Sequence, residues 1–174
     1  TGDYYQMEEM VFWNGYNLLE PSPGSRKQSQ GLWSTDSVRA MGWSYRSLGY
    51  AAYILPDAHP LKAYFKAKLL NNLARDKAYA DANASNPFGT LFMSEGNTQY
   101  RSFFDDFFTW SIGNVADLGF SEAIPILAYK SRFPIGRMGG ANGGDNGYCF
   151  QAAPAYTHPV GPTNSTLYTS WAQV

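Results

Sequence analysis

The sequence predicts an all-α protein built from antiparallel helical hairpins. Apolar residues recur every three or four positions over successive stretches of about 15 to 20 residues, the spacing of amphipathic helices. These stretches begin at capping or acidic residues and end at glycine or proline, which are the usual boundary signals of helices. Only residues 90–93 have the character of an extended segment, so we expect little strand.

The first two expected helices span residues 3–19 and 37–55. Acidic residues near the start of the first helix suit the positive end of its dipole, and the polar residues 34–36 offer capping oxygens to the second. Prolines and small polar residues make 20–30 a loop, and Pro56 ends the second helix.

The third expected helix runs from Pro60 to about Ala82 and carries a charged, solvent-facing side. The loop that follows, residues 83–99, is long, and loops of this length are uncommon unless they serve a function. The fourth expected helix covers residues 100–118 and ends at Gly119, a suitable C-terminal cap.

A fifth helix is expected to begin at Ser121 and to have ended by Pro134. Six glycines occur in residues 136–147, which predicts an irregular loop there. Three prolines make 148–162 irregular as well, and the polar residues 164–166 could cap a last helix that continues through Trp171.

The 174 residues have the length of one domain, so we expect a single helical domain over residues 1–174. The chain begins with Thr1 and no signal segment precedes Asp3, which predicts either a processed protein or a piece of a longer one. Removal of a secretory signal and excision from a longer parent are both origins of such a start, and the sequence leaves them open. An extracytoplasmic or secreted location is an expectation that accompanies a carbohydrate ligand.

Charge and hydropathy exclude two classes of partner. The formal net charge is −1 and the pI is about 6.0, so the sequence lacks the positive charge that attracts nucleic acid or anionic membranes. The apolar runs, such as residues 50–55 and 107–112, are far shorter than the roughly 20 residues of a membrane-spanning helix. We expect binding to neither nucleic acid nor membrane.

No metal or cofactor is expected from the sequence. Cys149 is the single cysteine, and His59 and His158 are the two histidines, too few for a typical zinc site. The glycine-rich segment 136–147 lacks the terminal Lys-Ser or Lys-Thr of a phosphate-binding loop and does not join a buried strand to a helix. A nucleotide site is therefore not predicted.

The unusual feature of the composition is its aromatic content. Aromatic residues make up 17% of the chain, whereas charged residues make up only 16%, well below the usual value of about 25%. Rings with a polar tip stack on sugars and fill protein interfaces. We therefore expect some rings to face a ligand or a partner, although an aromatic core is an equally simple interpretation.

The best candidate binding surface is a stripe on the expected helix 37–55. Arg39, Trp43, Arg46 and Tyr50 follow one another at helical spacing, beside the apolar stripe. Guanidinium groups donate paired hydrogen bonds and neighbouring rings offer flat apolar faces, which together suit an acidic or neutral carbohydrate. The competing interpretation places the arginines in ion pairs and the rings in the core.

The catalytic candidates lie in the segment Phe-Phe-Asp-Asp-Phe-Phe-Thr-Trp. Asp105 and Asp106 stand among five rings, where desolvation and mutual repulsion would raise a carboxyl pKa. Neighbours on a helix point about 100° apart, so one of them needs a partner elsewhere, such as Glu95 or Asp36. Trp110, which ends the segment, is a further candidate for substrate binding. The alternative is that both acids merely support the first turn of a helix.

Interior glycines predict close helix packing. Gly42 and Gly49 are seven residues apart on one expected helix, and Gly15 and Gly113 lie inside two others. Each costs about 1 kcal/mol relative to alanine in a helix, so a packing reason is expected at these positions.

The segment Ser-Val-Arg-Ala-Met-Gly-Trp-Ser-Tyr-Arg-Ser-Leu-Gly-Tyr-Ala-Ala-Tyr, residues 37–53, resembles the helices of the α/α-toroid enzymes, the six-hairpin glycosidases and toroid polysaccharide lyases. The resemblance covers about residues 36–118. It implies an arc or part of a toroid, and a polysaccharide bound or cleaved in a groove lined by aromatics, arginines and carboxylates. The alternative from another class is a non-catalytic structural or assembly subunit, whose rings contact other subunits or the rest of a longer chain.

Overall fold

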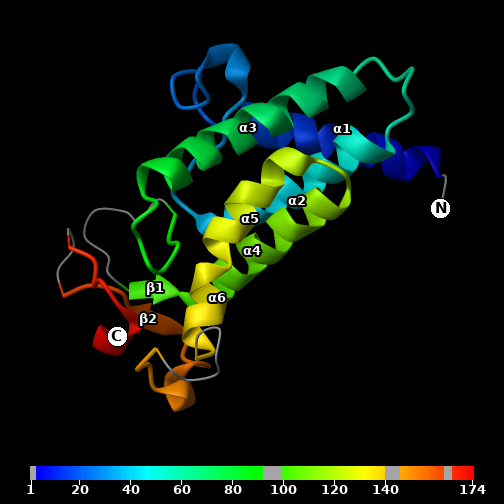
Figure 1. Cartoon of the computed structure of the whole chain (residues 1–174). Coiled ribbons are helices and arrows are strands. Elements are labelled where there is room, and N and C mark those ends of the chain that lie inside the picture. Colours follow the sequence, from blue (N-terminus) through cyan, green and yellow to red (C-terminus); the bar gives the residue numbers. More distant parts are fainter. Residues whose placement is uncertain (1–2, 92–98, 140–145, 163–165) are drawn as a thin grey trace.

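The computed structural model describes residues 3–91, 99–139, 146–162 and 166–174. These residues are mostly helical, and the one sheet among them has two short strands (Figure 1). The expected all-α class is therefore confirmed. The two ends of the chain lie at opposite ends of the molecule, the N-terminus beside α1 and the C-terminus beside the strands.

Long helices form the body of the molecule, and short elements follow them. The α-helices are α1 (Tyr4–Leu19), α2 (Val38–Ile54), α3 (Lys62–Ala82), α4 (Ser102–Asp117), α5 (Ile124–Lys130) and α6 (Arg132–Arg137). The strands are β1 (Gln99–Arg101) and β2 (Thr157–Pro159). Single 3₁₀ turns occur at Gln28–Gln30, Ser121–Ala123, Phe150–Ala152 and Trp171–Gln173.

The helices form two layers of opposite direction. Figure 1 shows α2 and α4 running the same way, with α1, α3 and α5 running against them. Contacts along α2 agree with this arrangement: the Trp43 ring lies 4.7 Å from that of Phe107, and the Tyr50 hydroxyl lies 3.3 Å from Asn114 Oδ1. The partners on α4 thus advance in the same direction as α2. Successive hairpins α2–α3 and α4–α5 lie side by side.

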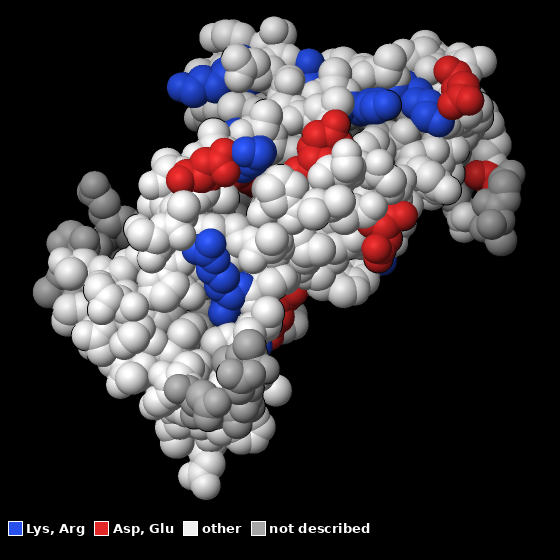
Figure 2. Space-filling view, in the orientation of Figure 1, with Lys and Arg blue, Asp and Glu red and all other residues white. Residues whose placement is uncertain are grey.

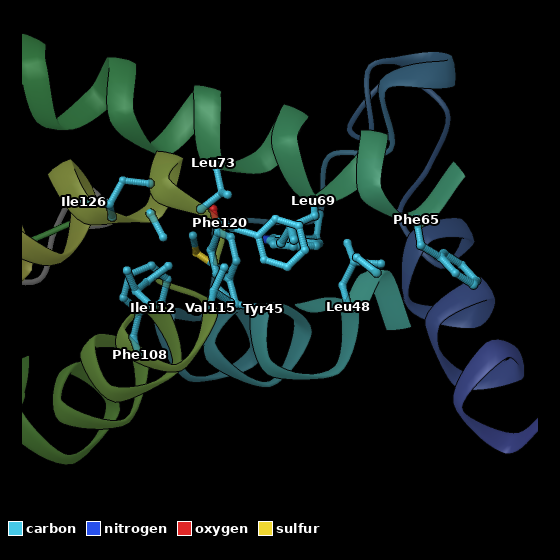
Figure 3. Close-up of a cluster of buried hydrophobic side chains, with 14 of the residues drawn as sticks. Tyr45, Leu48, Phe65, Leu69, Leu73, Phe108, Ile112, Val115, Phe120 and Ile126 are labelled. Atoms are coloured by element: carbon cyan, nitrogen blue, oxygen red, sulfur yellow. The ribbon is translucent and has the colours of Figure 1, made fainter. Parts of the chain in front are cut away.

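The main core lies between these layers (Figure 3). Leu69 and Leu73 of α3 meet Tyr45 and Leu48 of α2, and α4 and α5 close the other side. These side chains have almost no exposed surface, as the helical periodicity of the sequence requires. Removing their apolar area from water is the main source of stability for the bundle.

A second apolar cluster forms around the strands and the C-terminal residues. It contains Phe88, Tyr100, Phe133, Tyr148, Ala153, Val160 and Trp171. β1 and β2 pair antiparallel, with Tyr100 opposite His158. The Tyr148 hydroxyl is 2.7 Å from His158 Nδ1, so the buried imidazole is held in place. Burial lowers the pKa of His158 and keeps the ring neutral.

The helix termini agree closely with the sequence signals. The Asp3 carboxylate accepts a hydrogen bond from the Tyr5 amide and caps α1. Gly119 follows α4 with φ +95°, the left-handed conformation that glycine adopts without strain. The cap of α2 is Ser37, which accepts from the Ala40 amide, rather than any of the residues at 34–36.

The expectations for the last third of the chain were partly wrong. α5 ends at Lys130, and Pro134 then lies in the first turn of α6, where a missing N–H does no harm. Gly136 also belongs to this helix, and no larger residue fits there because a Cβ would lie 1.9 Å from the Trp171 indole nitrogen. The described residues 166–170 are not helical, and a single turn at Trp171–Gln173 replaces the expected last helix.

The expected extended segment at 90–93 was also misplaced. Thr90 and Leu91 are buried but not in a strand, and the rest of that segment lies outside the described residues. The strand forms instead at Gln99–Arg101, where it finds β2 as a partner.

Many of the charged side chains lie along α3. Figure 2 shows Lys, Arg, Asp and Glu following α3, with broad uncharged areas around them. This agrees with the solvent-facing charge predicted for that helix. In the described part of the chain, no helix combines the length and the apolar character needed to cross a bilayer.

Gly42→Ala should destabilise the bundle. A Cβ at this position would lie 2.9 Å from the Phe107 ring and 3.2 Å from the Phe108 Cα, so α2 and α4 would have to separate. We expect the free energy of unfolding to fall by about 1–3 kcal/mol in urea denaturation.

Gly113→Ala is the matched control, because its Cβ would meet only Leu127, at an ordinary 3.8 Å. Here the better helix propensity of alanine should raise the free energy of unfolding by up to about 1 kcal/mol. Equal effects of the two substitutions would show that the α2/α4 contact is not tight at Gly42.

Candidate functional site

The candidate site lies along the line where α2 and α4 meet. Gly42 and Gly49 allow the two helices to approach closely, since a Cβ on Gly49 would lie 3.0 Å from the Val115 side chain and one on Gly42 2.9 Å from Phe107. The outward side chains of α2 therefore continue directly into those of α4. Close packing, which the sequence predicted for these two glycines, is confirmed.

Seven residues form one continuous outer face, which we call the Arg–aromatic surface: Arg39, Trp43, Arg46, Arg101, Phe104, Phe107 and Trp110. The Arg46 guanidinium lies 5.4 Å from the Trp43 ring centre and 5.5 Å from that of Trp110. Phe107 stacks on Trp110 at 5.9 Å. The rings of the two helices are thus joined through one arginine.

Two further arginines share a ring at the other end of this surface. Arg39 lies 4.8 Å and Arg101 5.1 Å from the centre of the Phe104 ring. In the part of the chain that the structure describes, no ion pair or hydrogen bond occupies the guanidinium groups of Arg39, Arg46 and Arg101. Their donors remain available to a ligand, which is contrary to the interpretation that they form internal ion pairs.

A cavity of about 540 Å³ adjoins this surface at Trp110. Its walls come from α4, α5 and α6 and combine apolar with polar side chains. The lining residues are Asp106, Thr109, Trp110, Gly113, Asn114, Asp117, Leu127, Pro134, Arg137 and Met138. A volume of this size is typical of small-molecule and sugar-sized ligand sites.

The polar walls of the cavity have unused hydrogen-bonding capacity. Asp106 Oδ2 lies 2.5 Å from Arg137 Nη2, but Asp106 Oδ1 and Arg137 Nε are buried without a partner among the described residues. The same holds for Thr109 Oγ1 and Asn114 Nδ2. Unsatisfied buried polar atoms are costly, so these four atoms offer hydrogen-bonding capacity to a ligand in the cavity.

Asp105 lies in a different environment from its neighbour. Its carboxylate is completely buried and forms an ion pair with the equally buried Lys130, while the Tyr100 hydroxyl donates a hydrogen bond to it. Burial raises the pKa of Asp105 although Lys130 opposes the shift, and burial lowers the pKa of Lys130. The Lys130 ammonium also donates to the Gly89 carbonyl at 2.8 Å, so the pair fastens the loop after α3 to α5.

The structure thus separates the predicted catalytic residues. Asp106 lines the cavity with its side chain 41% exposed, whereas Asp105 lines none of the described cavities, and Glu95 lies outside the described residues. A group must touch its substrate to act as acid or base, so the placement of Asp105 suits a structural role. Asp36, the other expected partner, accepts a hydrogen bond from the Ser34 hydroxyl in the turn before α2.

The predicted binding residues all lie on or next to the α2/α4 line. Arg39, Trp43, Arg46 and Trp110 belong to the Arg–aromatic surface, and the Tyr50 hydroxyl reaches the cavity wall through Asn114. Sequence reasoning missed the cavity residues on α6, above all Arg137. Its glycine-rich context suggested a loop, and no local pattern pointed to its partner Asp106.

A second carboxylate lines the cavity at Asp117, but it is far from Asp106 along the helix. Eleven residues of α4 separate the two, a rise of about 16 Å. The paired carboxylates of glycosidases are about 5 to 9.5 Å apart. The cavity therefore has the features of a binding site more than those of a two-carboxylate active site.

Comparison of this chain with protein-family models, with curated proteins and with solved structures gives no match. The geometry of the α2/α4 line is therefore what supports a function for this chain.

Asp105→Asn should destabilise the protein strongly, because it leaves the Lys130 ammonium buried without its counter-charge. We expect a loss of about 3–5 kcal/mol in the free energy of unfolding at neutral pH. Asp106→Asn, the adjacent control, weakens a partly exposed pair with Arg137 and should cost no more than about 1 kcal/mol. Similar losses in urea denaturation would contradict the separation of the two roles.

Alkaline pH should weaken the same region through Tyr129, whose hydroxyl donates to the Thr90 carbonyl at 3.0 Å. Burial raises the pKa of Tyr129 from 10.0 to about 12. Because the unfolded phenol ionises first, stability is fully present below pH 10 and is lost as the pH rises toward 12, by about 2–3 kcal/mol.

Urea unfolding of the wild type and of Tyr129→Phe at several alkaline pH values measures this effect. The variant should lose less stability than the wild type between pH 10 and 12. Tyr156→Phe, at an exposed ring, is the control and should follow the wild type. Parallel curves for all three proteins would refute the assignment.

Proposed function

We propose that this chain binds an oligosaccharide or polysaccharide along the Arg–aromatic surface and in the cavity beside it. The observation that carries the proposal is the double position of Trp110, which belongs to both. An exposed ring beside buried, unpartnered hydrogen-bonding groups matches the two faces of a sugar ring, one apolar and one rich in hydroxyls.

Each group in the site has a chemical task in this proposal. Trp110 and Trp43 stack on the apolar faces of sugar rings, and the Arg46 guanidinium between them donates to hydroxyl or carboxylate oxygens. In the cavity, Asp106 accepts from hydroxyl groups while Arg137 holds it in place. Aromatic walls with a few fixed polar groups are the usual composition of ligand sites.

The proposal is binding, with cleavage as the narrower alternative. Asp106 is the carboxylate that reaches both the cavity and its aromatic edge, so it is the candidate acid or base for a glycoside hydrolase or polysaccharide lyase. A hydrolase of the two-carboxylate kind needs a second acid nearer than Asp117. The role of Glu95 as that partner stays a prediction.

We also propose that the fold is an arc of an α/α toroid. In support, the hairpins α2–α3 and α4–α5 lie side by side, with α2 and α4 parallel in one layer and α3 and α5 in the other (Figure 1). Repeating such hairpins around an axis would give a toroid. An extracytoplasmic location is a further prediction that accompanies a polysaccharide ligand.

Trp110→Ala tests the proposal against a panel of neutral and acidic polysaccharides, by isothermal titration calorimetry. For any glycan that the wild type binds, we expect at least a tenfold loss of affinity, about 1.4 kcal/mol, because the stacking face is removed. Asp106→Asn should also weaken binding, without unfolding the protein.

Trp13→Ala is the matched control, an equally exposed indole on α1, and it should bind a short oligosaccharide that occupies a single site like the wild type. Equal losses in the two tryptophan variants would remove the argument for the α2/α4 line. Failure of the wild type to bind any glycan in the panel would count against a carbohydrate ligand altogether.

A further inference from the structure

A second surface with large, exposed apolar side chains lies on α1. Phe12, Trp13, Tyr16 and Leu19 are each more than half exposed. The helix contains no Lys or Arg, and the carboxylate of Glu9 accepts a hydrogen bond from the Trp13 indole at 2.9 Å. The face is contiguous and largely apolar, with Glu9 at its edge, and a face of this kind on an isolated domain marks an interaction site.

This face continues into a groove between α1 and the start of α3. The groove has a volume of about 600 Å³ and is lined almost entirely by apolar side chains. Its walls are Val11, Phe12, Gly15, Tyr16, Leu19, Glu20, Leu61, Tyr64 and Phe65. We call the groove and the exposed residues of α1 together the α1 face.

Gly15 has no packing reason among the residues that the structure describes. A Cβ on Gly42 or Gly49 would press against α4, but a Cβ on Gly15 would meet no atom within 4 Å. A glycine inside a helix nevertheless costs about 1 kcal/mol relative to alanine. The close helix approach that the sequence predicted at Gly15 is absent from the described residues, so the approaching element must come from outside them.

We infer that the α1 face binds a second copy of this chain, with the two α1 helices crossing antiparallel at Gly15. Such an arrangement has two-fold symmetry, the commonest symmetry of protein dimers. The absent side chain at Gly15 lets the helix backbones approach, and Phe12 and Tyr16 of each copy enter the groove of the other. Gly15 of each copy then has a packing reason that the described part of a single copy does not supply.

Charge complementarity favours this partner and this direction. Glu8 lies seven residues before Gly15, so an antiparallel crossing places it level with residue 22 of the second copy. Arg26 lies there, because its guanidinium donates to the Leu19 carbonyl at 3.1 Å. Arg26 and Lys27 outnumber Glu20 at this end, so acidic and basic ends meet twice in the dimer, and a net charge of −1 per chain opposes association only weakly.

The available area approaches what a small specific interface needs. Aromatic side chains bury about 150–250 Å² each, so Phe12, Tyr16 and Tyr64, between 40% and 63% exposed, offer about 300 Å². Leu19 and Leu61 add to this, and specific interfaces at the lower end bury roughly 600 Å² per partner. A dimer of moderate affinity is therefore expected.

Sedimentation velocity of the 174-residue chain, from low micromolar to about 100 µM, tests the inference. The mass should rise with concentration from 19.3 kDa toward twice that value. Gly15→Ala should raise the dissociation constant at least tenfold, and its melting temperature in dilute solution should be unchanged or higher because alanine favours the helix. The double substitution Phe12→Ser, Tyr16→Ser should also abolish the dimer.

A charge exchange tests the antiparallel direction. Glu8→Lys with Glu9→Lys, and separately Arg26→Glu with Lys27→Glu, should each weaken self-association, and an equal mixture of the two variants should recover a dimer. Trp110→Ala is the control on the other surface and should dimerise normally. A chain that stays monomeric at about 100 µM, or a dimer that Gly15→Ala leaves unchanged, would overturn the inference.

Discussion

The close parallel contact of α2 and α4 at Gly42 and Gly49 is the constraint on which the rest of the structure depends. On its inner side it brings Tyr45 and Leu48 against Phe108 and Ile112, and the main core forms there. On its outer side it merges two helical stripes into the Arg–aromatic surface. One packing contact, made possible by two absent side chains, thus produces both the stability of the bundle and its candidate site.

The buried pair of Asp105 and Lys130 has a complementary role at the end of the bundle. Removing both charges from water is expensive, so the pair adds little net stability compared with apolar residues of equal size. What it adds is a fixed geometry, since Lys130 also holds the Gly89 carbonyl and Tyr100. This arrangement joins the helical core to the second apolar cluster, and it leaves the adjacent Asp106 directed to the cavity.

Sequence periodicity predicted the four long helices well because each buries one stripe in a single core. It failed at the short helix α6, which contains Pro134 and Gly136 and where the distant Trp171 ring packs on Gly136. The stripe from Arg39 to Tyr50 could be predicted because one helix carries it. The partners of Asp105 and Asp106 could not, because Lys130 and Arg137 come from helices 25 and 31 residues further along the chain.

The aromatic excess of this chain is divided between two outer faces that belong to opposite layers of the bundle. The Arg–aromatic surface lies on α2 and α4, whereas the α1 face lies on α1 and α3. Rings with free arginines and unpartnered polar groups suit a hydroxyl-rich ligand, while exposed rings beside an apolar groove suit a protein helix. Because the layers are opposite, pairing through α1 would leave both α2/α4 surfaces exposed. Two sites on one dimer could then engage the same polysaccharide, and even weak single sites would hold a long, repeating ligand firmly.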